Sequence, residues 1–316
     1  MAKAREIKRR IRSIDNTRQI TKTMEMVAAS KLKRAQDRVV AARPFDEFMR
    51  QVIMHVREGA ADELADFPLL RSSAITNRVG VLVVTSNRGL AGAFNANLVR
   101  AARAHMKVLR EDGKEIELHV IGKKGASMLR YLGDTPERTI VDLPDRPSYE
   151  DAGAVAEPLI DAFLAERLDA VYLVYSHFRS PVEQRPVVAQ LLPLPERGEM
   201  PAGFVSAETL ESGTDTGKRR TEGESGVRYE PVYEFLPSPA AILSQLLPLF
   251  LRYGIYRAIS ESAASEHGAR RTAMKNATDN AKELIRSLTR SYNRARQAQI
   301  TQEIAELVGG AEALKG

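Results

Sequence analysis

The chain has 316 residues, of which 43% are hydrophobic and 28% are charged, and it contains no cysteine. These values fit one or two folded domains, and the lack of cysteine excludes both a disulfide framework and a cysteine-ligated metal, as is usual in a reducing cytosol. The net charge of +6 is uneven: residues 1–43 carry 13 Lys and Arg against four acids, residues 252–300 carry ten against four, and the middle of the chain is acidic.

The first residues lack the features of a targeting signal. The start, MAKAREIKRR, is charged but has no apolar run behind it, so we expect no signal peptide. No stretch reaches 18 uninterrupted apolar residues, so we also expect no membrane-spanning helix. Peripheral attachment to a membrane remains open.

Residues 1–60 are predicted to form a long helix. No Gly or Pro occurs between residues 2 and 43, and apolar residues recur there at helical spacing. This stripe comprises Ile7, Ile11, Ile14, Ile20, Met24, Val27 or Ala28, Leu32, Ala35 and Val39. Pro44 interrupts the run, but Phe48, Val52 and Val56 extend the pattern, so we expect the helix to continue past the proline.

A small α/β domain is predicted for residues 78–195. Continuous apolar, β-branched runs such as VGVLVVT at 79–85 are typical of strands covered on both faces. Strands are expected at 79–85, 115–121, 170–175 and 187–192, the last two in a hairpin across Ser180-Pro181, and helices at 95–110, 123–131 and 149–166. This alternation indicates a mostly parallel, Rossmann-like sheet.

Residues 196–229 form a polar insertion between this domain and the C-terminal region. Its segment 211–228, ESGTDTGKRRTEGESGVR, has a single strongly apolar residue, Val227. Such a segment buries too little surface to offset its ordering entropy, so we expect it to be mobile.

A second long helix is predicted for residues 238–312. Ser238 suits an N-cap and Pro239 the first turn, whereas Pro248 is expected to bend or break the helix. Farther on, residues recur at alternating spacings of four and three, which indicates a coiled coil. This seam comprises Ala277, Ala281, Leu284, Leu288, Ser291, Ala295, Ala298, Gln302 and Ala305. About 60 helical residues extend roughly 90 Å, too far for one globular core to enclose.

The two long helices are therefore expected to pair antiparallel. The predicted fold class is α/β plus a long antiparallel α-helical coiled coil, a stalk of N- and C-terminal helices with a Rossmann-like head between them. The basic stalk is compatible with nucleic acid, an anionic membrane or an acidic protein partner, or simply with solvated helix faces. No DNA-binding module is present and aromatic residues do not interleave with the basic ones, so nucleic acid is the second choice.

No motif predicts catalysis or a cofactor. Gly89 and Gly92 follow a strand, but G-x-x-G is only part of a dinucleotide fingerprint, and a tight strand–helix turn explains it better. The run GTDTGK at 213–218 is one residue short of a P-loop, and GKKG at 122–125 is another strand–helix turn. The five histidines lack metal-ligand spacing, and no nucleophile elbow is present. We expect no cofactor, no metal and no enzymatic activity of its own.

Both ends of the chain resemble the gamma subunit of F-type ATP synthases. The C-terminal signature is ITQEIAE at 300–306 followed by Gly310-Ala311, and the N-terminal one is NTRQITK at 16–22 with MEMVAASK at 24–31. Shorter matches are ASEH at 264–267, Arg270, AMK at 273–275, TDN at 278–280, RGL at 88–90 and QLLPLP at 190–195. Ala91 stands where bacterial relatives often have cysteine, and the polar insertion is longer than the family needs.

The resemblance implies a rotary shaft. In this family the coiled coil stands inside a ring of alternating alpha and beta subunits, and the head sits with the epsilon subunit on the membrane rotor ring, at the cytoplasmic face of the bacterial inner membrane. Proton or sodium flow turns the shaft, which changes the nucleotide affinity of each catalytic beta site in turn. Neither nucleic acid nor a small-molecule substrate of its own is implied.

The resemblance also assigns contact residues. Those implied to engage the catch loops of the beta subunits are Arg270, Arg296, Gln297, Thr301 and Glu303. Met24 matches a position that faces the acidic loops of the beta subunits. Tyr233 and Phe235 lie, more loosely, near the place where the foot of the family meets the rotor ring and the epsilon subunit.

Overall fold

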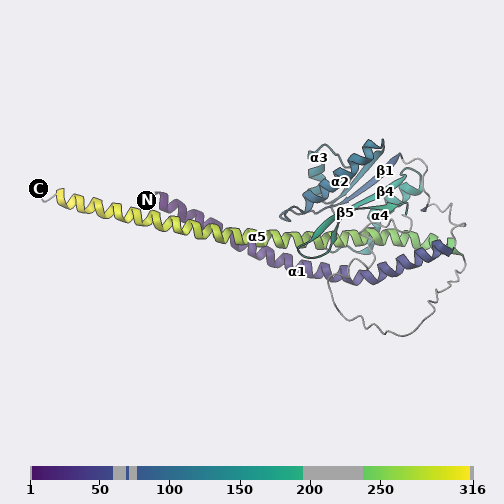
Figure 1. Ribbon diagram of the computed structural model, residues 1–316, viewed down its shortest axis with the longest axis horizontal. Coiled ribbons are helices and arrows are strands. Elements are labelled where there is room, and N and C mark those ends of the chain that lie inside the picture. The colour runs from purple at the N-terminus through teal and green to yellow at the C-terminus, as the bar shows by residue number, and fades with distance from the viewer. Residues whose placement is uncertain (1, 60–68, 71–76, 195–237, 314–316) are drawn as a thin grey trace, which may run out of the picture.

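The computed structural model describes residues 2–59, 69–70, 77–194 and 238–313, which form a long two-helix rod with a domain on one side (Figure 1). Helix α1 (Ala2–Gly59) and helix α5 (Pro239–Ala313) run antiparallel, and the C-terminal end of α5 projects past the N-terminus of α1. The expected stalk and head are confirmed. The predicted insertion at 196–229 lies outside the described residues.

The seam between α1 and α5 is rotated from the one that the sequence pattern suggests. Its α5 residues are Met274, Thr278, Ala281, Ile285, Leu288, Tyr292, Ala295 and Gln299. Leu284 is 49% exposed, and Ser291 and Ala298 also face solvent, so these predicted seam positions are wrong. In α1, Ile20 is likewise exposed and Thr21 is buried in its place. The four-and-three spacing of a coiled coil is kept in the shifted seam.

The seam contains a buried polar layer. Thr21 Oγ1 lies 2.8 Å from Thr278 Oγ1, and the Thr278 hydroxyl also lies 2.8 Å from the Met274 carbonyl oxygen. The Thr21 hydroxyl also lies 3.1 Å from the Arg18 carbonyl oxygen, so each threonine has a backbone acceptor in its own helix, and the contact between the two hydroxyls adds a preference for the register in which they meet.

Both long helices continue through a proline. α1 passes Pro44, as the apolar pattern predicts, and α5 passes Pro248, so of the bend or break expected there the break is wrong. Packing explains the second case, since Leu247 and Leu251 are fully buried in the core of the head. Burying several such side chains, at about 1.5–3 kcal/mol each, outweighs the roughly 3 kcal/mol cost of a proline inside a helix.

Two helix starts follow capping chemistry. Ser238 Oγ accepts a hydrogen bond from the Ala241 backbone N–H at 3.2 Å, which confirms the predicted cap of α5. Ser148 and Asp151 form a capping box at the start of helix α4 (Tyr149–Leu164), in which each side chain accepts from the other's backbone N–H.

The head is a five-stranded sheet. Its strands are β1 (Arg78–Val84), β2 (Glu115–Ile121), β3 (Arg138–Ile140), β4 (Ala170–Phe178) and β5 (Gln184–Leu192), in the spatial order β3-β2-β1-β4-β5. Neighbouring strands are parallel except β4 and β5, which form the expected hairpin. β3 is absent from the sequence prediction, and β4 and β5 extend closer to their turn than the apolar runs indicate.

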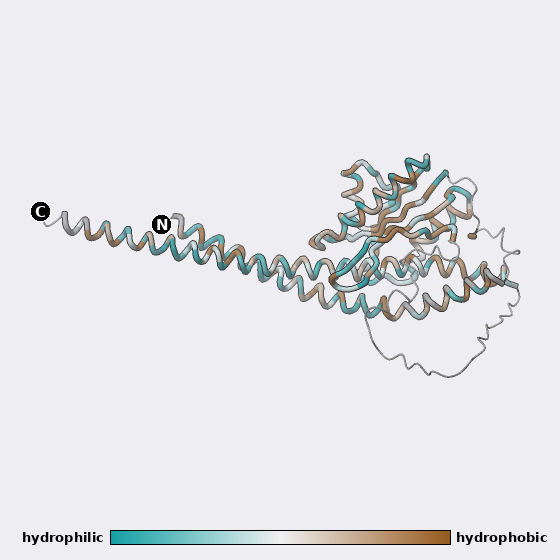
Figure 2. Tube along the Cα trace, viewed as in Figure 1, coloured by the Kyte–Doolittle hydropathy of each residue, from teal (hydrophilic) through white to brown (hydrophobic). Residues whose placement is uncertain are grey.

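Two hydrophobic cores lie on the two faces of the sheet. Helices α2 (Phe94–Glu111) and α3 (Lys123–Tyr131) pack on one face against Val81 and Val83 of β1. α4 and the first part of α5 pack on the other, against Leu82 and Val84. Figure 2 shows the hydrophobic strands gathered in the head, while hydrophobic and hydrophilic residues alternate along the rod. Because α5 belongs to one of these cores, the head and the rod are a single packed unit.

Candidate partner-binding surface

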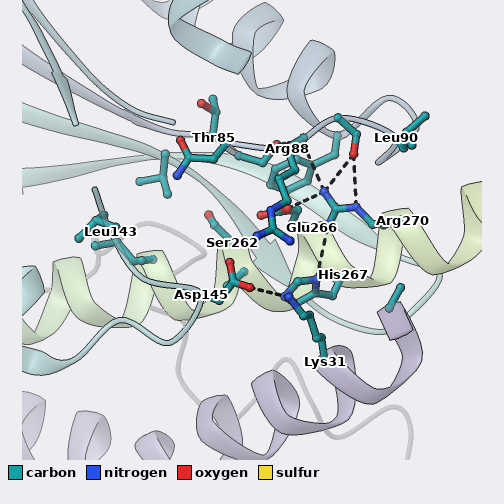
Figure 3. Close-up of a pocket in the computed structure, with 18 of the residues that line it drawn as sticks. Lys31, Thr85, Arg88, Leu90, Leu143, Asp145, Ser262, Glu266, His267 and Arg270 are labelled. Carbon is teal, nitrogen blue, oxygen red and sulfur yellow. Dashed lines mark hydrogen bonds and ion pairs between the residues drawn. The ribbon is translucent and has the colours of Figure 1, made fainter. Parts of the chain in front are cut away.

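The rod and the head meet around a pocket of about 330 Å³. Its walls come from α1, from the loops after β1 and before α4, and from the middle of α5 (Figure 3). Met24 and Arg270, two of the residues that the resemblance implies as partner contacts, both line this pocket. The antiparallel rod thus brings together two positions from opposite ends of the sequence.

The loop after β1 forms one edge of the pocket and turns the chain into α2. Leu90 (φ 62°) and Gly92 (φ 57°) adopt left-handed backbone conformations in this turn. At the start of α3, Gly122 has φ 99°, and a Cβ atom there would lie 2.5 Å from the Thr85 carbonyl oxygen. These two glycines therefore serve the tight strand–helix turns that the sequence predicts.

Arg270 is 8% exposed and joins α5 to the loop after β1. Its Nε and Nη2 atoms donate to the Gly89 carbonyl oxygen at 3.3 and 3.1 Å, and Nη2 also donates to Glu266 Oε1 at 2.6 Å. Burial raises the pKa of Glu266, an effect that the Arg270 guanidinium opposes. These contacts of Arg270 are internal to the chain, so a partner would reach it from the pocket.

On the other side of the pocket, Lys31 ties α1 to the loop before α4. Its Nζ donates to Asp145 Oδ2 at 2.5 Å, and this hydrogen bond lowers the pKa of Asp145. Met24 is half-buried on the same helix, two turns before Lys31. Sequence reasoning misses the Lys31–Asp145 pair, because partners so far apart in the chain leave no local signal.

The other predicted contact residues lie toward the C-terminal end of α5, two of them on the part that projects past α1 and two just before it, where α5 still lies beside α1. They are Arg296, Gln297, Thr301 and Glu303, and all four are exposed. Arg296 borders a groove of about 410 Å³ between the helices, which Arg5 and Lys8 of α1 also line. Every residue from Ile300, which lines this groove, to Val308 is exposed, so the predicted seam positions at 302 and 305 face solvent in the described part of the chain.

The projecting end also carries exposed apolar side chains at helical spacing. They are Ile300, Ile304, Leu307 and Val308. A solvent-facing apolar stripe on a helix is typical of a protein-binding face. The rod therefore has two candidate partner-binding surfaces. One is the pocket where the rod and the head meet, called the junction pocket below, and the other is this C-terminal end of α5, called the tip. Tyr233 and Phe235 lie outside the described residues.

Within the ranges 2–59, 69–70, 77–194 and 238–313, no three His, Asp or Glu side chains are grouped so as to hold a metal ion. Over the same ranges, no helix combines the length and the apolar character that crossing a membrane requires.

Comparison with known proteins gives one consistent family. A family profile described as ATP synthase matches residues 3–314. The chain is 47% identical to the ATP synthase gamma chain of Gemmatimonas aurantiaca, with 100% of both chains covered. It is 41% identical to the ATP synthase gamma chain of Synechococcus sp. (strain JA-3-3Ab), with 99% of this chain and 100% of the relative covered.

Solved structures with the same fold come from mitochondrial ATP synthases. The rotor of the Euglena gracilis enzyme matches with a TM-score of 0.59 at 20% identity, covering 95% of this chain and 99% of that one. A chain from the central stalk and c-ring of the Tetrahymena thermophila enzyme matches with a TM-score of 0.54 at 25% identity, covering 82% and 99%. A chain from the OSCP/F1/c-ring assembly of Euglena gracilis matches with a TM-score of 0.61 at 21% identity, covering 99% and 95%.

Proposed function

The chain belongs to the ATP synthase gamma-chain family, and from this premise we propose how its rod and head act. It is a non-catalytic subunit, the central rotor shaft, which couples ion-driven rotation of the membrane rotor ring to sequential conformational changes of the catalytic beta subunits. ATP synthesis results, or ATP hydrolysis in reverse. The observation that carries this function is the bare end of α5, which projects beyond both α1 and the head and can enter a surrounding ring (Figure 1).

The rod can transmit rotation because it is asymmetric. Two helices of unequal length present a different surface in each direction, so each of three surrounding catalytic sites meets a different face of the shaft. Each catalytic site has two conformations that contact the shaft differently, and the shaft shifts the site toward the conformation that contacts it more favourably. Rotation then transfers this shift in population to the next site. Nucleotide chemistry then belongs to the beta subunits, and this chain supplies the contact energy that differs among them.

The upper contact is assigned to the tip. Arg296, Gln297, Thr301 and Glu303 are proposed to engage the catch loops of the beta subunits, since all four are exposed where α5 is bare or nearly so. A guanidinium that meets a carboxylate there contributes about 1.5–3 kcal/mol through charge-assisted hydrogen bonds. Glu303 accepts a hydrogen bond from Gln299 Nε2 at 2.8 Å, so its carboxylate is already oriented along the helix.

The lower contact is assigned to the junction pocket. Met24 is half-buried at its wall and is proposed to face the acidic loops of the beta subunits. Arg270 is proposed as a catch contact from the same pocket. Because its guanidinium already bonds Glu266 and Gly89, an incoming carboxylate must compete with Glu266. We therefore expect Arg270 to contribute less to partner binding than the tip does.

The opposite end of the rod is assigned to the rotor ring and the epsilon subunit, with Tyr233 and Phe235 as proposed contacts on the family pattern. The Tetrahymena relative was solved together with its c-ring, and the Euglena one in an F1/c-ring assembly, which supports the rotor ring as a partner here. We propose that in a bacterial cell the chain is a peripheral subunit at the cytoplasmic face of the inner membrane.

Changing Arg296→Ala together with Gln297→Ala tests the tip contact in the assembled complex. We expect normal assembly with alpha, beta and epsilon subunits, but ATP hydrolysis and synthesis lowered about tenfold, which corresponds to roughly 1.4 kcal/mol on the barrier between rotational states. Lys282→Ala is the matched control, since Lys282 is an exposed cation on the same helix. Equal rates in the double variant and the parent, at the same subunit composition, would remove these residues from the mechanism.

A further inference from the structure

The junction pocket lies where open α/β sheets bind small molecules. The connections through α2 and α3 run from β1 toward one edge of the sheet, and the connection through α4 returns to β4 on the other side of β1. The order of strands therefore reverses at β1, and ligands in such folds bind at the carboxyl end of the strand where this occurs. Val84 and the loop from Thr85 to Leu90, which follow β1, form a wall of the pocket.

The walls are largely apolar and come from separate parts of the chain. The apolar lining residues are Met24, Val27, Val84, Leu143, Pro147 and Ile259. A volume of about 330 Å³ is at the lower end of the range for small-molecule sites, and apolar walls with a few converging polar groups are typical of them.

The charged groups of the pocket comprise more cations than carboxylates, and one cation, Arg88, acts on Asp145 and Glu266 only through its charge, which favours the ionised form of both. Lys31 pairs with Asp145, and Arg270 pairs with Glu266. The Arg88 side chain points into the same space (Figure 3), and its guanidinium makes no hydrogen bond or ion pair with the described part of the chain. Three cations thus face two carboxylates around one apolar space.

We propose that this pocket binds a small amphipathic monoanion, a carboxylate or sulfonate with an apolar body, whose headgroup pairs with Arg88. A guanidinium presents several N–H donors in a plane, which matches the oxygens of such a headgroup. The apolar body lies between Met24 and Val27 of α1 and Leu143 and Ile259 on the opposite walls. A bound molecule therefore bridges the rod and the head, and does not depend on nucleotide or on any other subunit.

The test uses the full chain with 8-anilinonaphthalene-1-sulfonate, a fluorescent aromatic monoanion, and octanoate as its competitor. We expect saturable binding at one site, displacement by octanoate, and no displacement by octanol, which has the same apolar body without charge. Arg88→Ala should weaken octanoate binding about tenfold or more, since it removes the charge-assisted contact. Val27→Glu, on an exposed helix position, adds a carboxylate to the wall and should weaken octanoate binding as well.

Arg100→Ala is the matched control, because Arg100 is an exposed arginine of the head that donates a hydrogen bond to the neighbouring Asn97 and lies outside this pocket. It should bind octanoate as the parent does. Equal octanoate affinity in Arg88→Ala and the parent, or displacement of the dye by octanol as strong as by octanoate, would overturn the proposal. So would an equal loss of affinity in Arg100→Ala.

Discussion

His267 is a buried histidine at the point where α1, α5 and the loop before α4 meet. Burial, together with the positive charges of Arg270, Lys31 and Arg38, lowers its pKa to about 4, while Asp145 opposes this shift. The imidazole is therefore neutral at physiological pH. Its neutrality matters for the pocket, because a protonated ring there would add a fourth cation to the junction.

The stability of the chain should fall in acid because of this residue. Between pH 6.5 and about 4 the unfolded chain binds a proton on His267 that the folded chain does not bind, so the free energy of unfolding decreases as pH falls across this window. From pH 7.5 to pH 5 the loss from this one group is about 2 kcal/mol. Urea unfolding at both pH values measures it. In His267→Gln the difference in stability between the two pH values should be smaller by that amount, and an unchanged difference would show that His267 titrates normally.

Most site residues could be assigned only through the resemblance to a family. Nothing in the local pattern distinguishes Arg296 from the other exposed cations of α5, whereas its match to a position in the C-terminal helix of the family does. The Lys31–Asp145 pair and the open guanidinium of Arg88 needed the structure, since each depends on segments that meet only in the fold. The sequence could have marked Arg88 as a residue of interest, because it belongs to the RGL match at 88–90, but not where its side chain points.

At the scale of elements, the threonine layer in the seam should set the register of the rod. A single hydroxyl donates one hydrogen, so the 2.8 Å contacts fit Thr278 donating to the Met274 carbonyl and Thr21 donating to Thr278. Thr278→Val removes this contact, and because the Thr21 hydroxyl can still donate to the Arg18 carbonyl oxygen at 3.1 Å, the change should cost about 0.5–1.5 kcal/mol in the free energy of unfolding.

The double variant Thr21→Val with Thr278→Val should restore most of that loss, because two apolar side chains of the same shape pack without an unpaired polar group. A double-mutant cycle by urea unfolding measures the coupling between the two positions. Additive losses from the two single changes would mean that the threonines do not act as a pair.

Sequence periodicity predicted where the two long helices occur better than it predicted which of their residues lie in the seam between them. Residues 277–305 contain two adjacent four-and-three tracks, one through Leu284 and one through Ile285, and only the partner helix decides between them. The strands of the head were easier, because runs such as VGVLVVT have no polar face. β3 has three residues and no apolar run, so it forms by pairing with β2 and not by its own pattern.

At the scale of the whole molecule, α5 holds the head against the rod with buried polar contacts as well as apolar ones. Glu261 accepts hydrogen bonds from His177 Nδ1 at 2.6 Å, from the Phe178 backbone N–H at 3.3 Å and from Arg257 Nε at 2.9 Å. Burial acts to raise the pKa of Glu261, but the hydrogen bonds and charges of His177 and Arg257 outweigh it, so the pKa lies below its ordinary value. A head clamped in this way turns with the rod, as a shaft that carries torque from a ring at one end requires.

The other end of the same helix is held by nothing within the described part of the chain, and this contrast gives a test of the whole arrangement. Amide hydrogens in 301–308 should exchange quickly in the isolated chain, because exposed helix ends open with free energies near zero. Amides in 255–281 should exchange slowly, since that part of α5 is buried against α1 and the head. Hydrogen-exchange mass spectrometry of the isolated chain and of the assembled complex compares them.

In the assembled complex the tip should become protected, because the catalytic ring covers the exposed stripe of Ile304 and Leu307 and excludes water from it. Helix α3, on the outer face of the head, is the internal control and should exchange equally in both samples. A tip that exchanges as quickly in the complex as in the isolated chain would mean that the ring does not grip it, and the proposed catch contacts would then have to lie lower on the rod. A tip already protected in the isolated chain would instead point to pairing between two copies of the chain, which a concentration series distinguishes because such protection weakens on dilution.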